Sequence, residues 1–239
     1  MVHALTDSLW LKKTGATAEE IARLREAITR DTGIEMALEG VYRWIVFAPS
    51  KMKSSRPVAA RFYGAFTDGS MKIRGLACRR HDTPLLIKQA QEEMLAVLAQ
   101  ARTLEELRER RQEAARIYEW YRAELERGGV DPRLLIVEQV LSREIEEYAV
   151  ETRASLAARE LIADGVNVHP GEKIGYVITN AKAKNKADRV STSNRNGPVD
   201  YDRQEYVTRL EVAAREIGVI VQAAPSRRGR ETNLSLPFD

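Results

Sequence analysis

Asp7 lies in a short polar stretch, Thr6-Asp7-Ser8, between two apolar-leaning segments at the start of the chain. This pattern predicts a tight hairpin in which two strands hold a single carboxylate at the tip. A carboxylate held in this way suits a divalent cation, because such ions prefer hard oxygen ligands. An ordinary structural turn is the alternative interpretation, because so short a hairpin carries little information by itself.

Two segments concentrate positive charge, although the net charge of the chain is only +3. Residues 51–80 carry eight Lys and Arg against one acid, and residues 180–196 carry five against one. Basic residues mixed with Ser, Thr and Asn are the types that contact a phosphate backbone, which predicts nucleic-acid binding. A solvated charged face is the alternative. The candidate nucleic-acid-binding residues in these two segments are Lys51, Lys53, Arg61, Arg74, Arg79, Arg80, Asn180, Lys182, Lys184, Lys186 and Arg189.

Length and composition are those of an ordinary packed protein of one large or two small domains, with 239 residues and 44% hydrophobic residues. A single cysteine, Cys78, excludes an intramolecular disulfide framework and a cysteine-based zinc site. The three histidines are scattered, and the sequence shows neither a signal peptide nor an 18-residue apolar run. These features predict a cytoplasmic protein without a membrane partner.

Residues 1–82 carry the signals of an α+β unit. Thr17 and Glu20 have the spacing of a capping box, an apolar helical stripe follows them, and Gly33 is placed to end that helix. Thr67 to Ser70 form a good hairpin turn between two alternating segments. The predicted strands lie within 34–48, 59–66 and 71–77.

After Thr83-Pro84, an N-cap followed by proline, the pattern becomes mostly helical. The last helix is expected to start at Asp202, with Glu205 completing a capping box, and to end at Gly218. Segment 180–200 lacks apolar periodicity and predicts an extended or loop region. Further helices are predicted just after Pro84 and over 103–126, 142–149 and 152–164, with a strand over 173–179.

The hairpin resembles motif C of family B DNA polymerases, a tyrosine-glycine-aspartate-threonine-aspartate-serine turn. On this match Asp7 is the second, metal-binding aspartate, while Leu5 and His3 replace the first aspartate and the tyrosine. The resemblance extends along the chain as an ordered series of short matches. These are Phe47–Lys51, Arg61-Phe62-Tyr63, Arg74-Gly75, Arg79–Asp82, Leu135–Gln139, Gly165-Val166, Pro170-Gly171, Ile174–Ile178, Asp188-Arg189 and Tyr201-Asp202.

The resemblance implies the C-terminal part of a polymerase palm, an antiparallel sheet with a helix, over residues 1–82. A mostly helical thumb that holds duplex DNA would follow over 83–226, and the same resemblance adds Thr6, Ser8 and Tyr63 to the candidate DNA-binding residues. It further implies DNA-directed DNA synthesis from dNTPs on primer–template DNA, with two Mg²⁺ ions bound partly by Asp7. The family's motif A, nucleotide-gripping fingers helix and exonuclease have no counterpart in this sequence.

The chain therefore resembles the small subunit of a split family B polymerase, whose large subunit would supply those missing parts. A fragment of a longer polymerase is the alternative origin, and we prefer the split subunit because Met1 reads as a natural start. Because Leu5 replaces an aspartate, a second functional hypothesis is a non-catalytic palm–thumb module that only binds duplex DNA. An unrelated structural protein with solvated basic loops is the remaining alternative.

Residues 227–239 are expected to form a flexible tail. Its end resembles a sliding-clamp-binding peptide, with Glu231, Leu234 and Phe238 at the positions of the expected glutamine, aliphatic and aromatic residues. A tail without a partner is the alternative.

Overall fold

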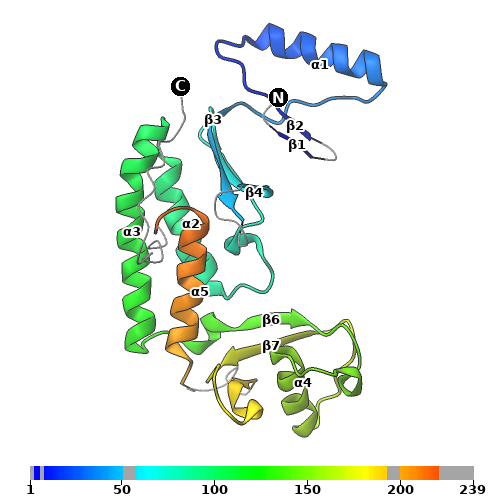
Figure 1. Cartoon of the computed structure of the whole chain (residues 1–239), viewed down its shortest axis with the longest axis vertical. Helices are drawn as coiled ribbons and strands as arrows, with labels where there is room; N and C mark the ends of the chain where they lie inside the picture. Colours follow the sequence, from blue (N-terminus) through cyan, green and yellow to red (C-terminus); the bar gives the residue numbers. More distant parts are fainter. Residues whose placement is uncertain (1–2, 6–7, 51–56, 193–199, 221–239) are drawn as a thin grey trace, which may run out of the picture.

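A computed structural model describes residues 3–5, 8–50, 57–192 and 200–220. Within this part the chain forms five α-helices and three small antiparallel sheets, which confirms the predicted α+β class. Figure 1 shows an N-terminal lobe at one end, a sheet with long helices beside it in the middle, and a second sheet with one helix at the other end. None of the described helices is long and apolar enough to cross a bilayer.

The N-terminal lobe, residues 3–5 and 8–41, contains the predicted hairpin and the first helix. Strands β1 (His3–Leu5) and β2 (Ser8–Trp10) pair antiparallel. Helix α1 (Ala18–Thr32) starts with the predicted capping box at Thr17 and ends at Gly33, whose φ is 71°. No residue of α1 is buried in the described structure. The chain between Ile34 and Val41 forms no strand, so the expected strand is shorter than predicted.

The central sheet has the order β3-β4-β5 (Tyr42–Pro49, Pro57–Phe66, Met71–Arg74). The predicted turn joins β4 to β5, and the Asp68 carboxylate accepts hydrogen bonds from the backbone and hydroxyl of Ser70. Aromatic rings pack edge to face on this sheet, with ring centroids 5.9 Å apart for Trp44 and Tyr63. Trp10 packs in the same way on Phe62 at 5.7 Å and so connects the N-terminal lobe to the sheet.

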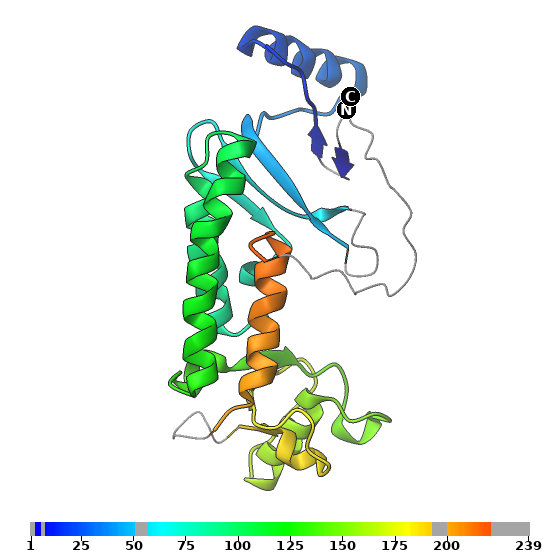
Figure 2. The ribbon, with the colours of Figure 1, turned by 60° about the vertical axis from the view of Figure 1, so that its left-hand side comes forward.

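Three helices, α2 (Leu85–Ala99), α3 (Leu104–Arg127) and α5 (Arg203–Glu216), pack together beside this sheet (Figure 2). Their apolar stripes are buried, as at Met94, Tyr118 and Leu210. Helix α2 begins one residue later than expected, because Pro84 rather than Thr83 is the N-cap and no side chain caps it. The sequence predicted these three helices correctly.

The second sheet has the order β6-β7-β8 (Val137–Val140, Lys173–Ile178, Val190–Ser191), with α4 (Arg153–Ala163) against it. The predicted helix over 142–149 is wrong, because only a short 3-10 helix, η3 (Ile145–Glu147), forms there. The neighbouring chain lacks a continuous apolar stripe to hold a longer helix.

Helix α5 connects the two halves of the molecule. At its start, the Tyr206 hydroxyl accepts a hydrogen bond from Ile178 N at 2.9 Å and donates one to Leu135 O at 2.8 Å. At its end, the Tyr63 hydroxyl donates to Ile217 O at 2.7 Å. One helix is thus bonded to the second sheet at one end and to the central sheet at the other.

Candidate nucleic-acid interface

A groove of about 700 Å³ lies between the chain that follows β5 and the edge of the second sheet. Arg79, Arg80 and Lys173 bring positive charge to it, and Asp82 and Glu138 bring negative charge. The groove is lined by Arg79, Arg80, His81, Asp82, Glu138, Gln139, Val140, Ser142, Tyr148, Thr152, Ala154 and Lys173. Two of the predicted DNA-binding residues, Arg79 and Arg80, therefore face a concave surface.

These two arginines differ in their surroundings. Arg79 is exposed and makes no ion pair with any other described residue. Arg80 is half-buried, and its guanidinium pairs with Glu216 at 2.8 Å and more loosely with Asp82 at 3.9 Å. Arg79 is therefore available to an external phosphate, whereas Arg80 is held in place by the protein.

Arg61 and Tyr63 have internal roles in this structure. The Arg61 guanidinium pairs with Glu216 at 2.6 Å and donates to Pro49 O at 3.4 Å. Tyr63 is fully buried, and burial raises the pKa of its phenol. A direct contact of the Tyr63 ring with DNA, as the sequence suggested, is therefore not available in this structure, because the ring is buried and its hydroxyl donates to Ile217 O.

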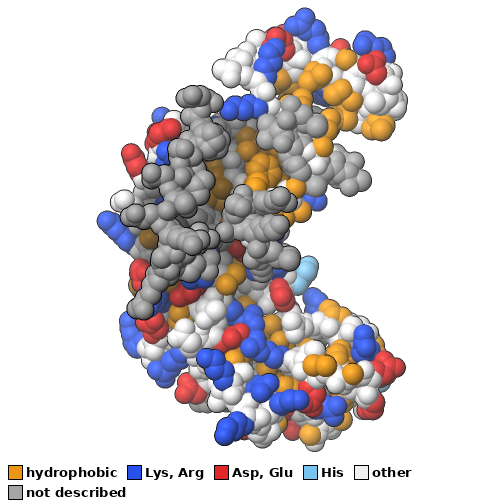
Figure 3. Space-filling view, in the orientation of Figure 1, with side chains coloured by type: hydrophobic (Ala, Val, Ile, Leu, Met, Phe, Trp, Pro, Cys, Tyr) orange, Lys and Arg blue, Asp and Glu red, His pale blue; other side chains and the backbone are white. Residues whose placement is uncertain are grey.

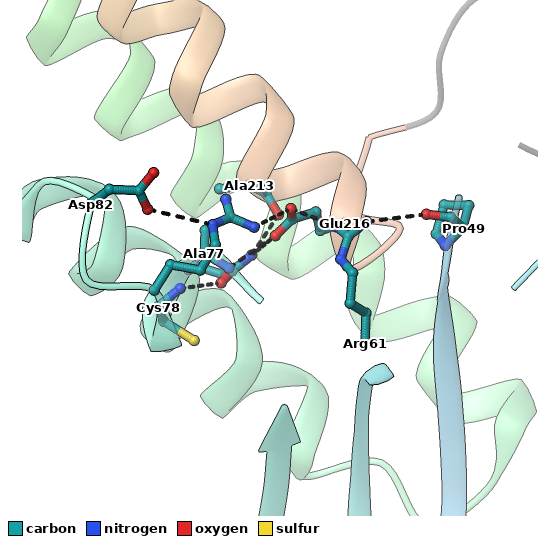
Figure 4. Close-up of polar contacts among 9 residues, drawn as sticks. Pro49, Arg61, Ala77, Cys78, Asp82, Ala213 and Glu216 are labelled. Atoms are coloured by element: carbon teal, nitrogen blue, oxygen red, sulfur yellow. Dashed lines mark hydrogen bonds and ion pairs between the residues drawn. The ribbon is translucent and has the colours of Figure 1, made fainter. Parts of the chain in front are cut away.

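The buried carboxylate of Glu216 joins residues from four segments, which we call the Glu216 cluster: Arg61, Ala77, Arg80, Gln91 and Glu216 (Figure 4). Its Oε1 accepts from both guanidinium groups, and its Oε2 accepts from Ala77 N at 2.9 Å and Gln91 Nε2 at 3.4 Å. The Glu216 side chain is only 4% exposed. Removing one partner from a buried ionic network of this kind costs about 3–5 kcal/mol.

Gln91 on α2 supports the same cluster. Its amide accepts from Cys78 N at 2.7 Å and donates to Ala213 O at 2.8 Å. Cys78 beside it is buried, and this burial raises the pKa of its thiol to about 11, so the thiol stays protonated at neutral pH. The cluster is therefore structural rather than nucleophilic.

Sequence reasoning missed Glu216. A signal was present, because this carboxylate lies three residues after Ala213 on the same buried stripe of the last helix. A charged residue on a buried helical face requires a partner, and the surplus of arginines in residues 51–80 could supply one.

The second basic segment forms the connection between β7 and β8. Lys182 and Lys184 are exposed and make no ion pair within the described ranges. Lys186 pairs with Glu151 at 2.8 Å, and Arg189 donates through Nε to Ala183 O at 2.9 Å. Asn180 uses its side-chain oxygen to accept from Lys182 N at 3.3 Å. Of the five predicted DNA-binding residues in this segment, two are exposed lysines and three have partners within the chain.

The other predicted residues occupy separate places. Arg74 is exposed at the end of β5, and Ser8 opens β2 opposite Leu5. Several predicted residues lie outside the described residues, namely Thr6, Asp7, Lys51, Lys53, Glu231, Leu234 and Phe238. Among the residues that are described, no group of three His, Cys, Asp or Glu side chains is arranged to hold a metal ion.

Comparison of the sequence with known proteins finds DNA polymerases. The sequence model of DNA polymerase family B matches residues 2–216. DNA polymerase 2 of Aeropyrum pernix is 27% identical over 179 residues, which cover 75% of this chain and 20% of that protein. DNA polymerase 1 of Sulfolobus acidocaldarius is 24% identical over 219 residues, which cover 91% of this chain and 23% of that protein.

A solved structure shares the fold. The family B DNA polymerase of the hyperthermophilic archaeon Pyrobaculum calidifontis matches with a TM-score of 0.61 at 23% identity. The match covers 90% of this chain and 26% of that one. The chain thus spans about a fifth to a quarter of the length of the polymerases that it resembles.

Proposed function

The chain belongs to DNA polymerase family B, and from this membership we propose that it is the small subunit of a split polymerase. Residues 1–82 would be the C-terminal part of the palm, and residues 83–226 the thumb. A separate large subunit would provide the rest of the palm, the fingers and the exonuclease. Together the two chains would extend a primer on a DNA template from dNTPs.

The observation that carries this proposal is the exposed apolar surface of the N-terminal lobe. Helix α1 buries none of its residues, and Leu24 in its apolar stripe is 46% exposed. Other large apolar side chains of the lobe are also exposed: Leu9, Leu11, Ile34, Leu38 and Val41. Figure 3 shows hydrophobic side chains gathered on the lower side of this lobe. An apolar surface of this kind is typical of a protein interface.

The apolar surface of the N-terminal lobe includes a groove beneath α1. It measures about 400 Å³ and is lined by Ile21, Ala22, Leu38 and Val41, with Lys13 and Arg25 among the residues at its rim. A palm built from two chains would leave this kind of surface open until the partner binds. The occupant we propose is the large subunit, because the related polymerases contain three quarters or more of their length outside the matched region.

Asp7 would supply one carboxylate of the catalytic centre. Two Mg²⁺ ions, when bound, would activate the primer 3′-hydroxyl and neutralise the triphosphate. At least one further carboxylate would come from the large subunit. Asp7 and this partner carboxylate would then have to be brought together by subunit assembly.

The groove and the exposed lysines would hold the duplex. Arg79, Arg80 and Lys173 line the groove, and Lys182 and Lys184 are exposed in the connection between β7 and β8. Contacts from such side chains to phosphates position a duplex without reading its sequence. The tail with Glu231, Leu234 and Phe238 would bind a sliding clamp.

Leu5 favours a second candidate, a palm–thumb module that binds duplex DNA without catalysis. Leu5 occupies the position of the first motif C aspartate, and it cannot bind a metal ion. Both candidate functions use the groove to bind duplex DNA, and they differ in whether the hairpin binds a catalytic metal ion.

Primer extension distinguishes them. The purified chain alone should show no nucleotidyl transfer, because on this proposal the large subunit supplies the second metal-binding carboxylate and the nucleotide-gripping helix. Mixed with the large subunit and Mg²⁺, it should extend a primed template. Extension by the chain alone would contradict the split-subunit proposal, and duplex binding without any extension in the mixture would favour the non-catalytic module.

A further inference from the structure

We propose that Glu216 is a positioning residue that sets the affinity of the chain for duplex DNA through Arg80, without touching the DNA. This inference rests on the proposed role of the groove as the duplex-binding surface. It assigns a function in DNA binding to an acidic residue, whereas acids ordinarily repel a polyanion.

The first step concerns which cation of the cluster a ligand can reach. The Glu216 carboxylate pairs with two guanidinium groups, those of Arg61 and Arg80, and Asp82 lies 3.9 Å from Arg80, so the charges of these four side chains balance. Arg61 is nearly enclosed, with a side chain 16% exposed, while the Arg80 side chain is 33% exposed and lines the groove. Arg80 is therefore the cation that a ligand in the groove can reach.

The second step is the orientation of Arg80. Its Nη1 donates to Glu216 at 2.8 Å, and its Nε lies 3.9 Å from Asp82. A guanidinium held by a charge-assisted hydrogen bond loses little rotamer freedom when it then binds phosphate. Without Glu216, Arg80 would have to be ordered by the DNA itself, and the affinity would fall.

The third step is the position of Glu216 in the fold. As the last residue of α5, it bonds to Arg80, which lines one wall of the groove, and to Ala77 N just before it in the chain. Tyr206 near the other end of the same helix bonds to Ile178 N and Leu135 O, next to the strands of the other wall. Helix α5 therefore links the segment that carries Arg80 to the second sheet, and Glu216 is its contact at the Arg80 end.

The test measures binding of the full chain to a fluorescently labelled duplex by anisotropy, together with thermal unfolding of each variant. Glu216→Gln is compared with Glu211→Gln, which removes the same charge from the same helix; among the described residues Glu211 forms an ion pair with Arg215 alone, at 2.9 Å. If net charge alone matters, both variants should bind slightly more tightly. We expect Glu216→Gln to bind roughly tenfold more weakly, the size of one charge-assisted contact, and Glu211→Gln not to weaken binding.

Arg80→Ala and the double variant Arg80→Ala/Glu216→Gln complete a double-mutant cycle for duplex affinity. If Glu216 acts through Arg80, the glutamine should have little further effect once Arg80 is absent. Glu216→Asp, which keeps the charge but shortens the reach, should also weaken binding, and it replaces Glu216→Gln if that variant does not fold.

Unchanged or tighter duplex binding by Glu216→Gln or Glu216→Asp would overturn the inference. A loss of affinity from Glu216→Gln that is just as large in the Arg80→Ala variant would also overturn it. A wild-type chain that does not bind duplex DNA would contradict the proposed groove as well. Wild-type binding that Arg80→Ala weakens and the Glu216 variants do not would contradict this inference alone.

Discussion

The hydroxyl of Tyr63 on β4 donates a 2.7 Å hydrogen bond to the backbone carbonyl of Ile217, the residue that follows α5. The last carbonyls of a helix have no partner within the helix, so Tyr63 satisfies one of them. Residues 154 positions apart in sequence are joined in this way. The contact explains why a tyrosine that resembles a DNA-contacting motif residue is buried in this chain.

Asp7→Asn should abolish primer extension by the assembled enzyme, by at least about a hundredfold, because a metal ligand is lost. Assembly and duplex binding should change little, since the proposed phosphate contacts are made by other residues. Asp68→Asn is the matched control, because Asp68 is a turn carboxylate whose hydrogen bonds, within the described ranges, go to Ser70. Near-normal turnover by Asp7→Asn would make Asp7 a structural turn residue.

Lys182→Ala combined with Lys184→Ala should weaken duplex binding about equally for all sequences. If both lysines contact phosphate, the slope of log K against log salt should fall in magnitude by about 1.8. Lys186→Ala serves as the control in the same segment, because Glu151 already neutralises Lys186 at 2.8 Å. An unchanged slope in the double variant, with the fold intact, would identify this segment as a solvated loop.

Leu24→Asp should prevent assembly with the large subunit and leave the isolated chain stable. Leu24 is exposed, so the free energy of unfolding of the isolated chain should change by less than about 0.5 kcal/mol. A charge placed in an apolar interface should weaken association by at least about tenfold. Co-purification and sedimentation with the large subunit measure this, with Arg30→Glu on the same helix as the control. Normal assembly of Leu24→Asp would place the interface elsewhere.

The chain should lose stability in alkaline solution above about pH 10, the ordinary pKa of a phenol. Burial raises the pKa of Tyr176 to about 12 and raises the pKa of Tyr63 and Tyr206. The unfolded chain then releases its phenol protons first, so stability is complete below pH 10 and declines as the pH rises towards the folded pKa values. Denaturant unfolding at about pH 8 and about pH 11 measures this decline.

Tyr206→Phe isolates one contribution to this alkaline loss. The variant should be less stable at neutral pH by about 1–3 kcal/mol, because Ile178 N loses a buried acceptor and Leu135 O a donor. Its stability should then fall less steeply with pH than that of the wild type. Tyr148→Phe is the control, since hydrogen bonds to Ser142 lower the pKa of Tyr148. An equal alkaline slope in wild type and Tyr206→Phe would contradict this account.

The sequence by itself determined the elements that depend on neighbouring residues. The capping box at Thr17, the turn at Asp68 and the apolar stripe of the last helix all involve contacts within four residues along the chain. Such local interactions have the same geometry wherever the segment lies, so they can be read from residue types and spacing. The ordered series of short matches also identified the family, which the comparison confirmed.

Only the tertiary structure decided which charged residues face a ligand and which face one another. Arg61 and Arg79 have the same residue type and lie in the same basic segment, yet one pairs with Glu216, 155 residues away, and the other lines the groove. Likewise Lys182 is exposed while Lys186 pairs with Glu151. The reason is physical: the partner of a charge depends on distances between segments far apart in sequence, and these distances exist only after the core has packed.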